Sequence, residues 1–235
     1  MLFGVQNKNF SEDLKVIYNA LVKKEKFSFS KYADGEFAIL VNQTITNCDN
    51  WTFDSEKHSM YRDELMYSFK FDQPGYYVGI SCPCCVGNDD TMWMRNNVGV
   101  KPENLTWANI FVNGNYNFFK NNFIPEFSNH DVIIVAHENA NISNLPFKVE
   151  EHIGIKETAW KDNFDLLELL PNRDYSNKLF LFCAGPLGNM LSARMWEYNK
   201  ENTYMDIGST LNTYLVGANR GYLKGAQTLN KFCIW

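Results

Sequence analysis

Short apolar segments alternate with amphipathic helical patterns along most of this chain. The first helical pattern covers residues 11–24, where Leu14, Ile17 and Leu21 recur at helical spacing behind Ser11 as N-cap. Strands are expected at residues 27–33, 76–80, 108–112, 131–136 and 179–184, and further helices at 61–69, 116–123, 164–170 and 190–196. Strands that alternate with helices favour an α/β fold with a largely parallel sheet flanked by helices.

The length of the chain and its lack of a linker-like segment favour a single domain. With 235 residues, of which 45% are hydrophobic, the chain can bury a sizeable core. No internal repeat, low-complexity tract or Pro/Gly-rich linker marks a second unit. We therefore expect one Rossmann-like domain over residues 1–235.

Charge and hydropathy exclude several classes of partner. The chain has 22 Lys and Arg residues against 27 Asp and Glu residues, and it has no basic run that could neutralise a series of phosphates. Nucleic acid is therefore not expected to bind. No apolar run approaches the roughly 20 residues of a transmembrane helix. Residues 1–9 lack the pattern of a secretory signal, so we expect a cytoplasmic protein.

Cysteine usage fits a reducing compartment. The six cysteines are expected to be thiols because the core is large enough to fold without disulfides. The cluster Cys82-Pro83-Cys84-Cys85 resembles half of a metal site, but the sequence offers no paired second half for a tetrahedral zinc centre. It is interpreted as a structural or substrate-lining loop.

The expected strand ends indicate where a ligand would bind. In open parallel sheets, ligands bind beyond the carboxyl ends of the strands. Four such ends carry distinctive residues: Asp34-Gly35-Glu36, Ser81-Cys82-Pro83, His137-Glu138-Asn139 and Gly185-Pro186-Leu187-Gly188.

The first of these segments has the composition of a site for a hard divalent cation. Carboxylates at i and i+2, here Asp34 and Glu36, can converge on one Mg²⁺ or Mn²⁺, and Gly35 between them leaves room for a diphosphate. The alternative is a solvated turn. A second triplet of the same kind, Asp54-Ser55-Glu56, lies in a polar stretch rather than at a strand end.

Two later features could complete a phosphate site. The turn at residues 185–188 joins an expected strand to a helix, whose N-terminus favours an anion, although a plain tight turn fits equally well. Asp206 ends the next short strand, where it would bind nucleoside hydroxyls or cap a helix.

The remaining candidates are a possible base, a possible cation and possible stacking surfaces. His137 or Glu138 would act as a general base, or would be hydrogen-bonded loop residues. Arg220 would bind a diphosphate or carry surface charge. Trp107 and Trp160 would stack on a base or a sugar, or would belong to the core.

Two motifs, in this order along the chain, resemble those of the GT-D fold glycosyltransferases. Residues 28–36, Ser-Phe-Ser-Lys-Tyr-Ala-Asp-Gly-Glu, are similar to the family pattern S-x-x-R-[FY]-G-D-G-E. Residues 184–188 and 205–208, Ala-Gly-Pro-Leu-Gly and Met-Asp-Ile-Gly, are similar to G-P-x-[AG] followed by D-I-G. The resemblance implies a metal and nucleotide-diphosphate role for Asp34 and Glu36, and site roles for Gly185, Gly188 and Asp206.

Three positions depart from the family pattern. Lys31 stands where arginine is usual, and it offers a point charge to a phosphate instead of a bidentate fork. Ala33 replaces a glycine, and Ser209 replaces a frequent histidine, so no role is transferred to that position.

The expected function is transfer of a sugar from a nucleotide-diphosphate donor, with a UDP-sugar as the expected donor, to a hydroxyl of a glycan or glycosylated acceptor. Mn²⁺ or Mg²⁺ would be the cofactor, held by Asp34 and Glu36, with Lys31, Gly35, Gly185, Gly188 and Arg220 near the donor phosphates. Asp206, Glu138 and His137 are candidates for a catalytic base. The alternatives are a metal-dependent phosphohydrolase and a non-catalytic nucleotide- or glycan-binding module.

Overall fold

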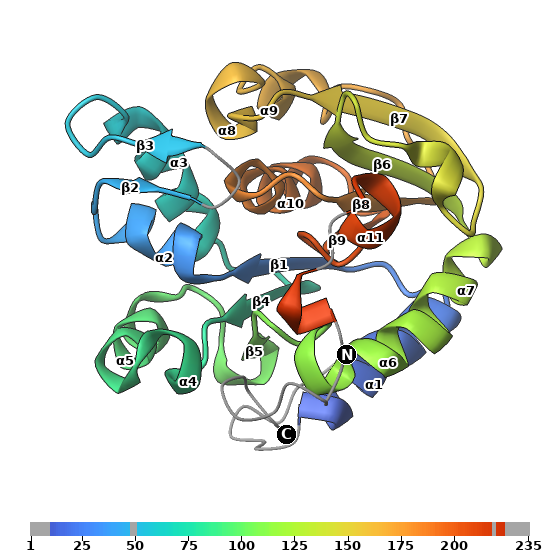
Figure 1. Cartoon of the computed structure of the whole chain (residues 1–235), viewed down its shortest axis with the longest axis horizontal. Helices are drawn as coiled ribbons and strands as arrows, with labels where there is room; N and C mark the ends of the chain where they lie inside the picture. The colour runs from blue at the N-terminus through green and yellow to red at the C-terminus, as the bar shows by residue number, and fades with distance from the viewer. Residues whose placement is uncertain (1–9, 48–50, 218–219, 224–235) are drawn as a thin grey trace.

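A seven-stranded parallel sheet forms the centre of the molecule (Figure 1). The computed structural model describes residues 10–47, 51–217 and 220–223. The strand order is β5-β4-β1-β9-β8-β6-β7, and each neighbouring pair is parallel. The strands are β1 (Ser28–Tyr32), β4 (Tyr76–Ile80), β5 (Leu105–Trp107), β6 (Asp131–His137), β7 (Val149–Ile155), β8 (Lys178–Phe182) and β9 (Thr203–Asp206). A short antiparallel hairpin, β2 (Ile45–Thr46) with β3 (Thr52–Phe53), lies apart from this sheet.

Helices cover both faces of the sheet, as the alternation of strands and helices predicts. The larger ones are α1 (Phe10–Val22), α3 (Ser59–Lys70), α5 (Asn88–Asn97) and α10 (Pro186–Tyr198). The shorter ones are α2 (Asp34–Leu40), α4 (Pro83–Val86), α6 (Tyr116–Phe118), α7 (Ile124–Glu126), α8 (Ala159–Asp162), α9 (Leu166–Leu169) and α11 (Asn212–Leu215). A π-helical segment, Phe119–Phe123, joins α6 to α7.

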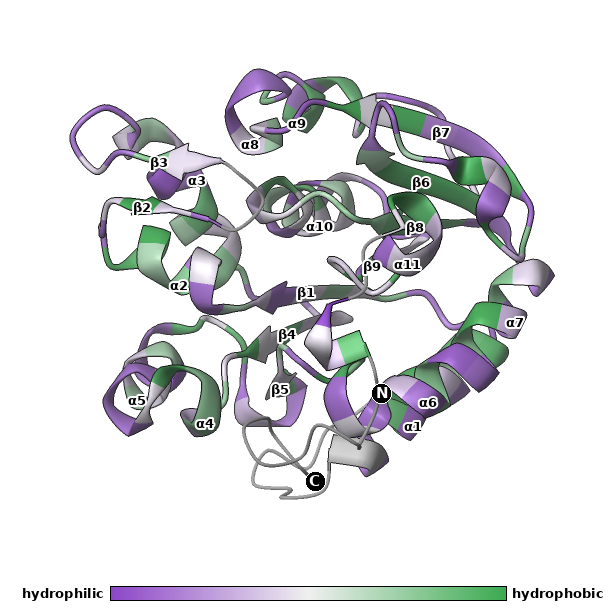
Figure 2. Cartoon of the chain, in the orientation of Figure 1, coloured by the Kyte–Doolittle hydropathy of each residue, from purple (hydrophilic) through white to green (hydrophobic). Residues whose placement is uncertain are grey.

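The alternation of side chains along the buried strands divides the core into two layers. Phe180 and Phe182 of β8 pack in one layer with α10, whereas Leu179 and Leu181 pack in the other with α1. Strand β6, which lies between β8 and β7, is apolar along nearly all of its length, and Figure 2 shows it in green. This double burial explains why the central strands read as continuous apolar runs in the sequence.

Two strands of the sheet illustrate where the structure differs from the sequence predictions. The prediction of a strand at residues 108–112 is wrong, because β5, the strand that pairs with β4, ends at Trp107. Ile110 and Phe111 are buried, but their segment forms turns, with the Ile110 and Val112 N–H groups donating to the carbonyls of Trp107 and Asn109. Strand β7 was not predicted, because it is an edge strand in which apolar residues alternate with polar and charged ones.

Among the described residues, no helix combines the length and the apolar character that crossing a bilayer requires.

Candidate functional site

A charged cluster lies at the carboxyl edge of the sheet, where β1 and β9 run side by side. Phe29 pairs with Met205, so Lys31 and Asp206 follow within two residues at the same edge. Asp34 and Glu36 lie just beyond the end of β1, in the first turn of α2. Residues 175 positions apart in the chain therefore meet, and the Lys31 N–H donates to Asp206 Oδ2 at 3.2 Å.

Asp206 is the buried anion of this cluster. Its side chain is 1% exposed, and its Oδ1 accepts a hydrogen bond from the Gly208 N–H at 3.0 Å. Burial raises the pKa of Asp206 to about 6, even though the Lys31 charge and the two backbone N–H groups act in the opposite direction. The nearby Glu36 carboxylate adds to this rise, so the pKa of Asp206 lies above its ordinary value despite the facing cation.

Lys31 is the cation that Asp206 faces. Burial lowers the pKa of Lys31, but the carboxylates of Asp206, Glu36 and Asp34 outweigh that effect, so its pKa lies above the ordinary value. The ammonium is thus held charged at the rim. Its position depends on Gly208, because a Cβ built on this glycine would lie 2.5 Å from both Lys31 Cε and Nζ.

We expect Gly208→Ala to destabilise the protein by about 1–3 kcal/mol. Gly208 has φ of +52°, a conformation that disfavours a side chain, and the added methyl would also displace the Lys31 ammonium. Denaturant unfolding measures the change in the free energy of unfolding. Gly114→Ala is the matched control, since a Cβ there meets nothing within 4 Å.

Asp34 and Glu36 lie in the same helical turn but in different environments. Asp34 is exposed, whereas Glu36 is 7% exposed and its Oε2 accepts a hydrogen bond from the Ala33 N–H at 2.9 Å. Burial raises the pKa of Glu36, and the Lys31 charge partly offsets this rise. Glu36 therefore caps the start of α2 and fixes the path of the chain from β1 to Asp34.

The chemistry of these donors fits a hard divalent cation. Mg²⁺ and Mn²⁺ take oxygen ligands and are commonly bound by one or two carboxylates together with substrate phosphates. Asp34 offers an exposed carboxylate of this kind, with Glu36 two residues away. The Lys31 charge close to both favours a phosphate in the same place.

The turn that joins β8 to α10 borders the same cluster. Gly185 precedes α10 with φ of +53°, and Pro186 begins the helix. The Gly188 N–H donates to the Gly185 carbonyl at 2.8 Å, so this N–H is already hydrogen-bonded within the turn. A Cβ on Gly188 would lie 3.1 Å from Phe182 Cβ and 3.6 Å from Asp206 Cγ, so this glycine also allows α10 to approach the sheet.

Two residues of the site were not identified from the sequence. Asn189 is fully buried, and its Nδ2 donates to Ser30 Oγ at 3.0 Å and to the Lys31 carbonyl at 2.7 Å, which ties α10 to the end of β1. Trp51 lies 3.4 Å from a Cβ built on Gly35, and its Nε1 lies 4.0 Å from one built on Gly185. Trp51 thus lies close to both Gly35 and Gly185. Local sequence patterns do not reveal this contact between distant segments.

Arg220 lies in a short described segment next to the cluster. Its guanidinium is 5.9 Å from the Tyr222 ring, and the Tyr222 hydroxyl lies 2.6 Å from Ser209 Oγ. Because Tyr222 also influences the pKa of Lys31, this segment borders the same rim. The role of Arg220 toward a phosphate stays a prediction.

His137 and Glu138 lie farther along the rim. Their strand, β6, is separated from β9 by β8, which puts them roughly 10 Å from Asp206 at the usual strand spacing. His137 Nδ1 accepts from the Asn139 N–H at 3.1 Å, and the Glu138 N–H donates to the Ile155 carbonyl at 2.8 Å. The structure does not bring them into the Lys31 cluster, and their role as a base stays a prediction.

The other sequence candidates have structural partners. Trp160 is 1% exposed in the core, and Trp107 lies under the Arg95 guanidinium at 5.2 Å. Asp54 Oδ1 accepts from the Glu56 N–H at 3.0 Å and its Oδ2 pairs with Lys57 Nζ at 2.7 Å. The second Asp-x-Glu triplet therefore forms a turn, away from any strand end of the seven-stranded sheet.

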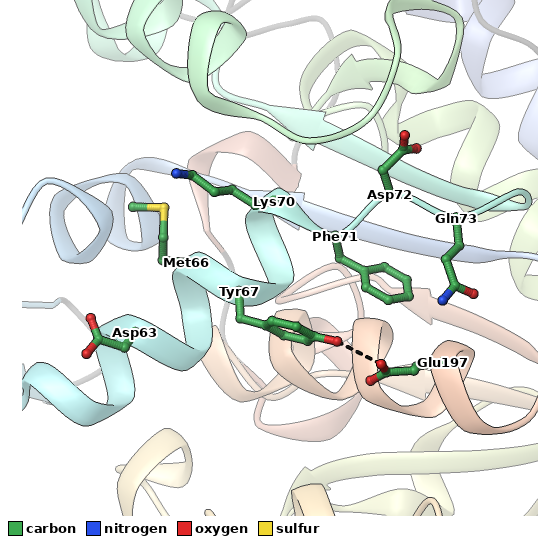
Figure 3. Close-up of a pocket in the computed structure, with 8 residues that line it drawn as sticks. All are labelled: Asp63, Met66, Tyr67, Lys70, Phe71, Asp72, Gln73 and Glu197. Carbon is green, nitrogen blue, oxygen red and sulfur yellow. Dashed lines mark hydrogen bonds between the residues drawn. The ribbon is translucent and has the colours of Figure 1, made fainter.

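A separate pocket of about 490 Å³ lies at the opposite end of the sheet (Figure 3). Its lining includes Lys70, Phe71 and Gln73, which precede β4, and Glu197 near the end of α10. The Tyr67 hydroxyl donates to Glu197 Oε1 at 2.9 Å. This pocket adjoins the amino ends of the strands, and the charged cluster does not contribute to it.

The seven-stranded sheet, covered by helices on both faces, defines a parallel α/β protein. The chain is similar to a solved structure described as the highly conserved domain of unknown function 1792, which has a distinct glycosyltransferase fold. The two share 15% identity with a TM-score of 0.58, over 87% of this chain and 79% of that one.

A selenomethionine-substituted structure of domain of unknown function 1792 gives 14% identity and a TM-score of 0.56, with the same coverage. No protein-family model and no curated protein matches the sequence. The chain therefore has a glycosyltransferase fold of the GT-D type, and the fold expected from the two motifs is confirmed.

Proposed function

We propose that this protein is a metal-dependent glycosyltransferase that moves a sugar from a nucleoside-diphosphate donor, a UDP-sugar, to a hydroxyl of a glycan acceptor. The observation that carries the proposal is the convergence of Lys31, Asp34, Glu36 and Asp206 at the carboxyl edge of β1 and β9, within a glycosyltransferase fold. Cationic and anionic groups side by side suit a diphosphate that binds together with a divalent cation.

Different residues of the cluster would bind the cation and the donor phosphates. Asp34, with Glu36 beside it, would hold Mn²⁺ or Mg²⁺, which when bound neutralises charge on the departing diphosphate. Lys31 would contact a donor phosphate with its ammonium, while Asp206 keeps this ammonium charged and in place. Gly35 leaves space beside the phosphates, where a side chain would contact Trp51.

The acceptor hydroxyl needs alignment and, for inversion, a base. Asp206 has a pKa of about 6, which suits proton transfer near neutral pH, but its two oxygens accept backbone N–H groups. Exposed Glu138 lies farther along the rim and faces no such constraint at its side chain. We favour Asp206 as the group that positions Lys31, with Glu138 or His137 as the candidates for a base toward a bound acceptor.

A donor-hydrolysis screen tests the reaction class. Many glycosyltransferases slowly transfer the sugar to water, so incubation with a panel of nucleotide sugars and Mn²⁺ should release nucleoside diphosphate from one donor. Loss of this release on chelation of the metal supports the proposal. Release of inorganic phosphate in place of nucleoside diphosphate would favour a phosphohydrolase, and no turnover of any donor would favour a binding module.

A further inference from the structure

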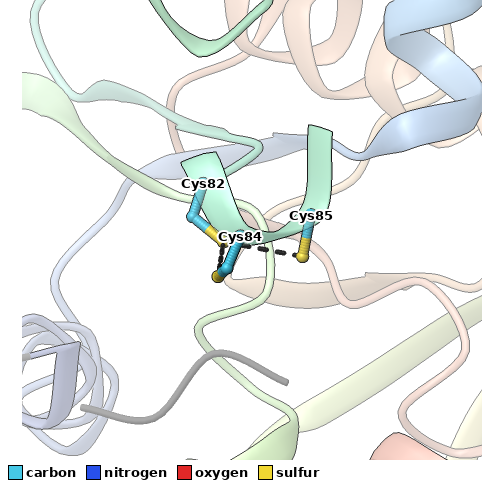
Figure 4. Close-up of side chains that lie close together, drawn as sticks. All are labelled: Cys82, Cys84 and Cys85. Carbon is cyan, nitrogen blue, oxygen red and sulfur yellow. Dashed lines mark hydrogen bonds between the residues drawn. The ribbon is translucent and has the colours of Figure 1, made fainter. Parts of the chain in front are cut away.

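A group of three cysteine sulfurs lies outside the cluster described above (Figure 4). Cys82, Cys84 and Cys85 follow the end of β4, and their sulfur atoms all lie within 4.8 Å of one another. Cys82 Sγ is 2.8 Å from Cys84 Sγ and 3.5 Å from Cys85 Sγ. Three thiol groups from one turn of chain thus point to a common centre.

The backbone of the turn explains this convergence. Cys82 is the extended N-cap of α4, Pro83 begins the helix, and the N–H groups of Cys85 and Val86 donate to the Cys82 carbonyl. Gly87, with φ of +90°, ends the single helical turn. The three side chains are therefore carried around one tight turn, and a second Cys-x-x-Cys half is not needed to gather three sulfurs.

Neighbouring elements hold this turn in place. Thr91 Oγ1 of α5 donates to the Gly87 carbonyl at 2.9 Å, and Ser81 Oγ donates to the Tyr32 carbonyl at 3.2 Å. Cys82 is 1% exposed, whereas Cys84 and Cys85 are exposed. The group is thus anchored on its inner side and accessible on its outer side, so an ion can reach it from solvent.

An amide also faces the sulfurs. Asn109 Nδ2 lies 3.7 Å from Cys82 Sγ and 3.7 Å from Cys85 Sγ, close enough to donate N–H···S hydrogen bonds to both. Such donors stabilise sulfur in its anionic, metal-ligating form, and they orient ligands around a metal. Asn109 comes from the turn after β5, so a second element supports the same centre.

We propose that Cys82, Cys84 and Cys85 bind one thiophilic metal ion of the Zn²⁺ class. Sulfur ligands select such ions, and with Zn–S bonds of about 2.3 Å the sulfurs of a tetrahedral site lie about 3.8 Å apart. Small side-chain rotations reach that spacing from the observed distances. Each thiol loses its proton to solvent as its S–metal bond forms, and no electron is transferred.

This site is distinct from the one proposed for the donor diphosphate. The ligands there are carboxylates, which suit Mg²⁺ or Mn²⁺, whereas thiolates discriminate against those ions. The two sites nevertheless share one rim, because β4 pairs with β1 directly. A metal at the cysteines would fix the loop that follows β4, next to the end of β1, whether or not the protein is a glycosyltransferase.

Titration of the full chain with Co²⁺, a coloured substitute for Zn²⁺, tests this proposal. The reduced, metal-stripped protein should bind one Co²⁺ with an intense sulfur-to-cobalt charge-transfer absorption, and equimolar Zn²⁺ should remove the colour. Cys84→Ser and Cys85→Ser, both at exposed positions, should weaken the charge-transfer band and lower Zn²⁺ affinity at least about tenfold. Asn109→Ala should lower Zn²⁺ affinity by about tenfold as well.

Cys183→Ser is the matched control, because it also removes one thiol but lies at the end of β8. It should leave the charge-transfer band and the Zn²⁺ affinity unchanged. Circular dichroism of each variant checks that it is folded. The proposal is overturned if the reduced wild type shows no charge-transfer band, if the band survives in both Cys84→Ser and Cys85→Ser, or if these thiols form a disulfide and take up no metal.

Discussion

Asp34→Ala is expected to lower kcat/KM for the donor by about 10²- to 10³-fold while the protein stays folded. Asp34 is exposed at the start of α2, so its removal costs at most the interaction of one carboxylate with a short helix end, about 0.3–1 kcal/mol. The effect on turnover is large because the carboxylate would hold the cation that stabilises the departing diphosphate. Steady-state kinetics with the donor found in the hydrolysis screen gives the ratio.

Asp54→Ala provides the matched control for this prediction. It removes an aspartate from the other Asp-x-Glu triplet, whose ion pair with Lys57 lies in an exposed turn. Turnover should stay within about twofold of the wild type, since surface changes of this kind are worth less than about 0.5 kcal/mol. Equal kinetic losses in the two variants, or none in Asp34→Ala, would show that Asp34 does not act on the donor.

Lys31→Met is expected to destabilise the protein by about 3 kcal/mol at pH 8. This value is the lower end of the range for breaking a buried ion pair, and it is chosen because Lys31 is only partly buried. It leaves Asp206 and Glu36 facing each other without a cation. Lys31→Arg keeps the charge and should retain most of the stability. Lys26→Met, the same change at a partly buried lysine before β1, should change the free energy of unfolding by less than about 0.5 kcal/mol.

The loss in Lys31→Met should depend on pH in a definite direction. The folded pKa of Asp206 is about 6, above the ordinary value of 3.8, and removal of the Lys31 charge raises it further. The folded variant then binds a proton that the unfolded chain releases, so its stability increases as the pH falls toward 5. Urea unfolding at pH 5 and pH 8 measures this, and a stability loss that is equal at both pH values would contradict the assigned burial of the carboxylate.

Local sequence patterns predicted the strand ends at which the charged cluster lies. Alternation of apolar and polar residues locates β1, and an apolar run locates β8. The rule that ligands gather at the carboxyl ends of parallel strands then singles out Asp34 and Gly185. Asp206 was also placed at a strand end. What local patterns do not contain is the pairing of β1 with β9, and this pairing puts Asp206 against Lys31.

The features that sequence reasoning missed depend on contacts between distant segments. The sequence pattern places Asn189 at the start of a helix, but it does not show that the side-chain amide of Asn189 donates a hydrogen bond to the Lys31 carbonyl. Trp51 directly precedes the short strand β3, but it packs against Gly35 and Gly185 from other parts of the chain. Cys82, Cys84 and Cys85 were interpreted as part of a structural or substrate-lining loop because the sequence offers no paired second half of a zinc site. A single turn nevertheless suffices to bring their sulfurs together.

Calorimetric titration of the wild-type protein with UDP, with and without Mn²⁺, tests the central claim most directly. Under the proposed function, the diphosphate would bind at the charged rim together with the cation, so affinity should rise at least tenfold when Mn²⁺ is present. Asp34→Ala should lose this dependence on Mn²⁺, and Asp54→Ala should keep it. Equal affinity for UDP with and without Mn²⁺, or a dependence on Mn²⁺ that Asp34→Ala leaves unchanged, would contradict the assignment of a metal-diphosphate site to Asp34.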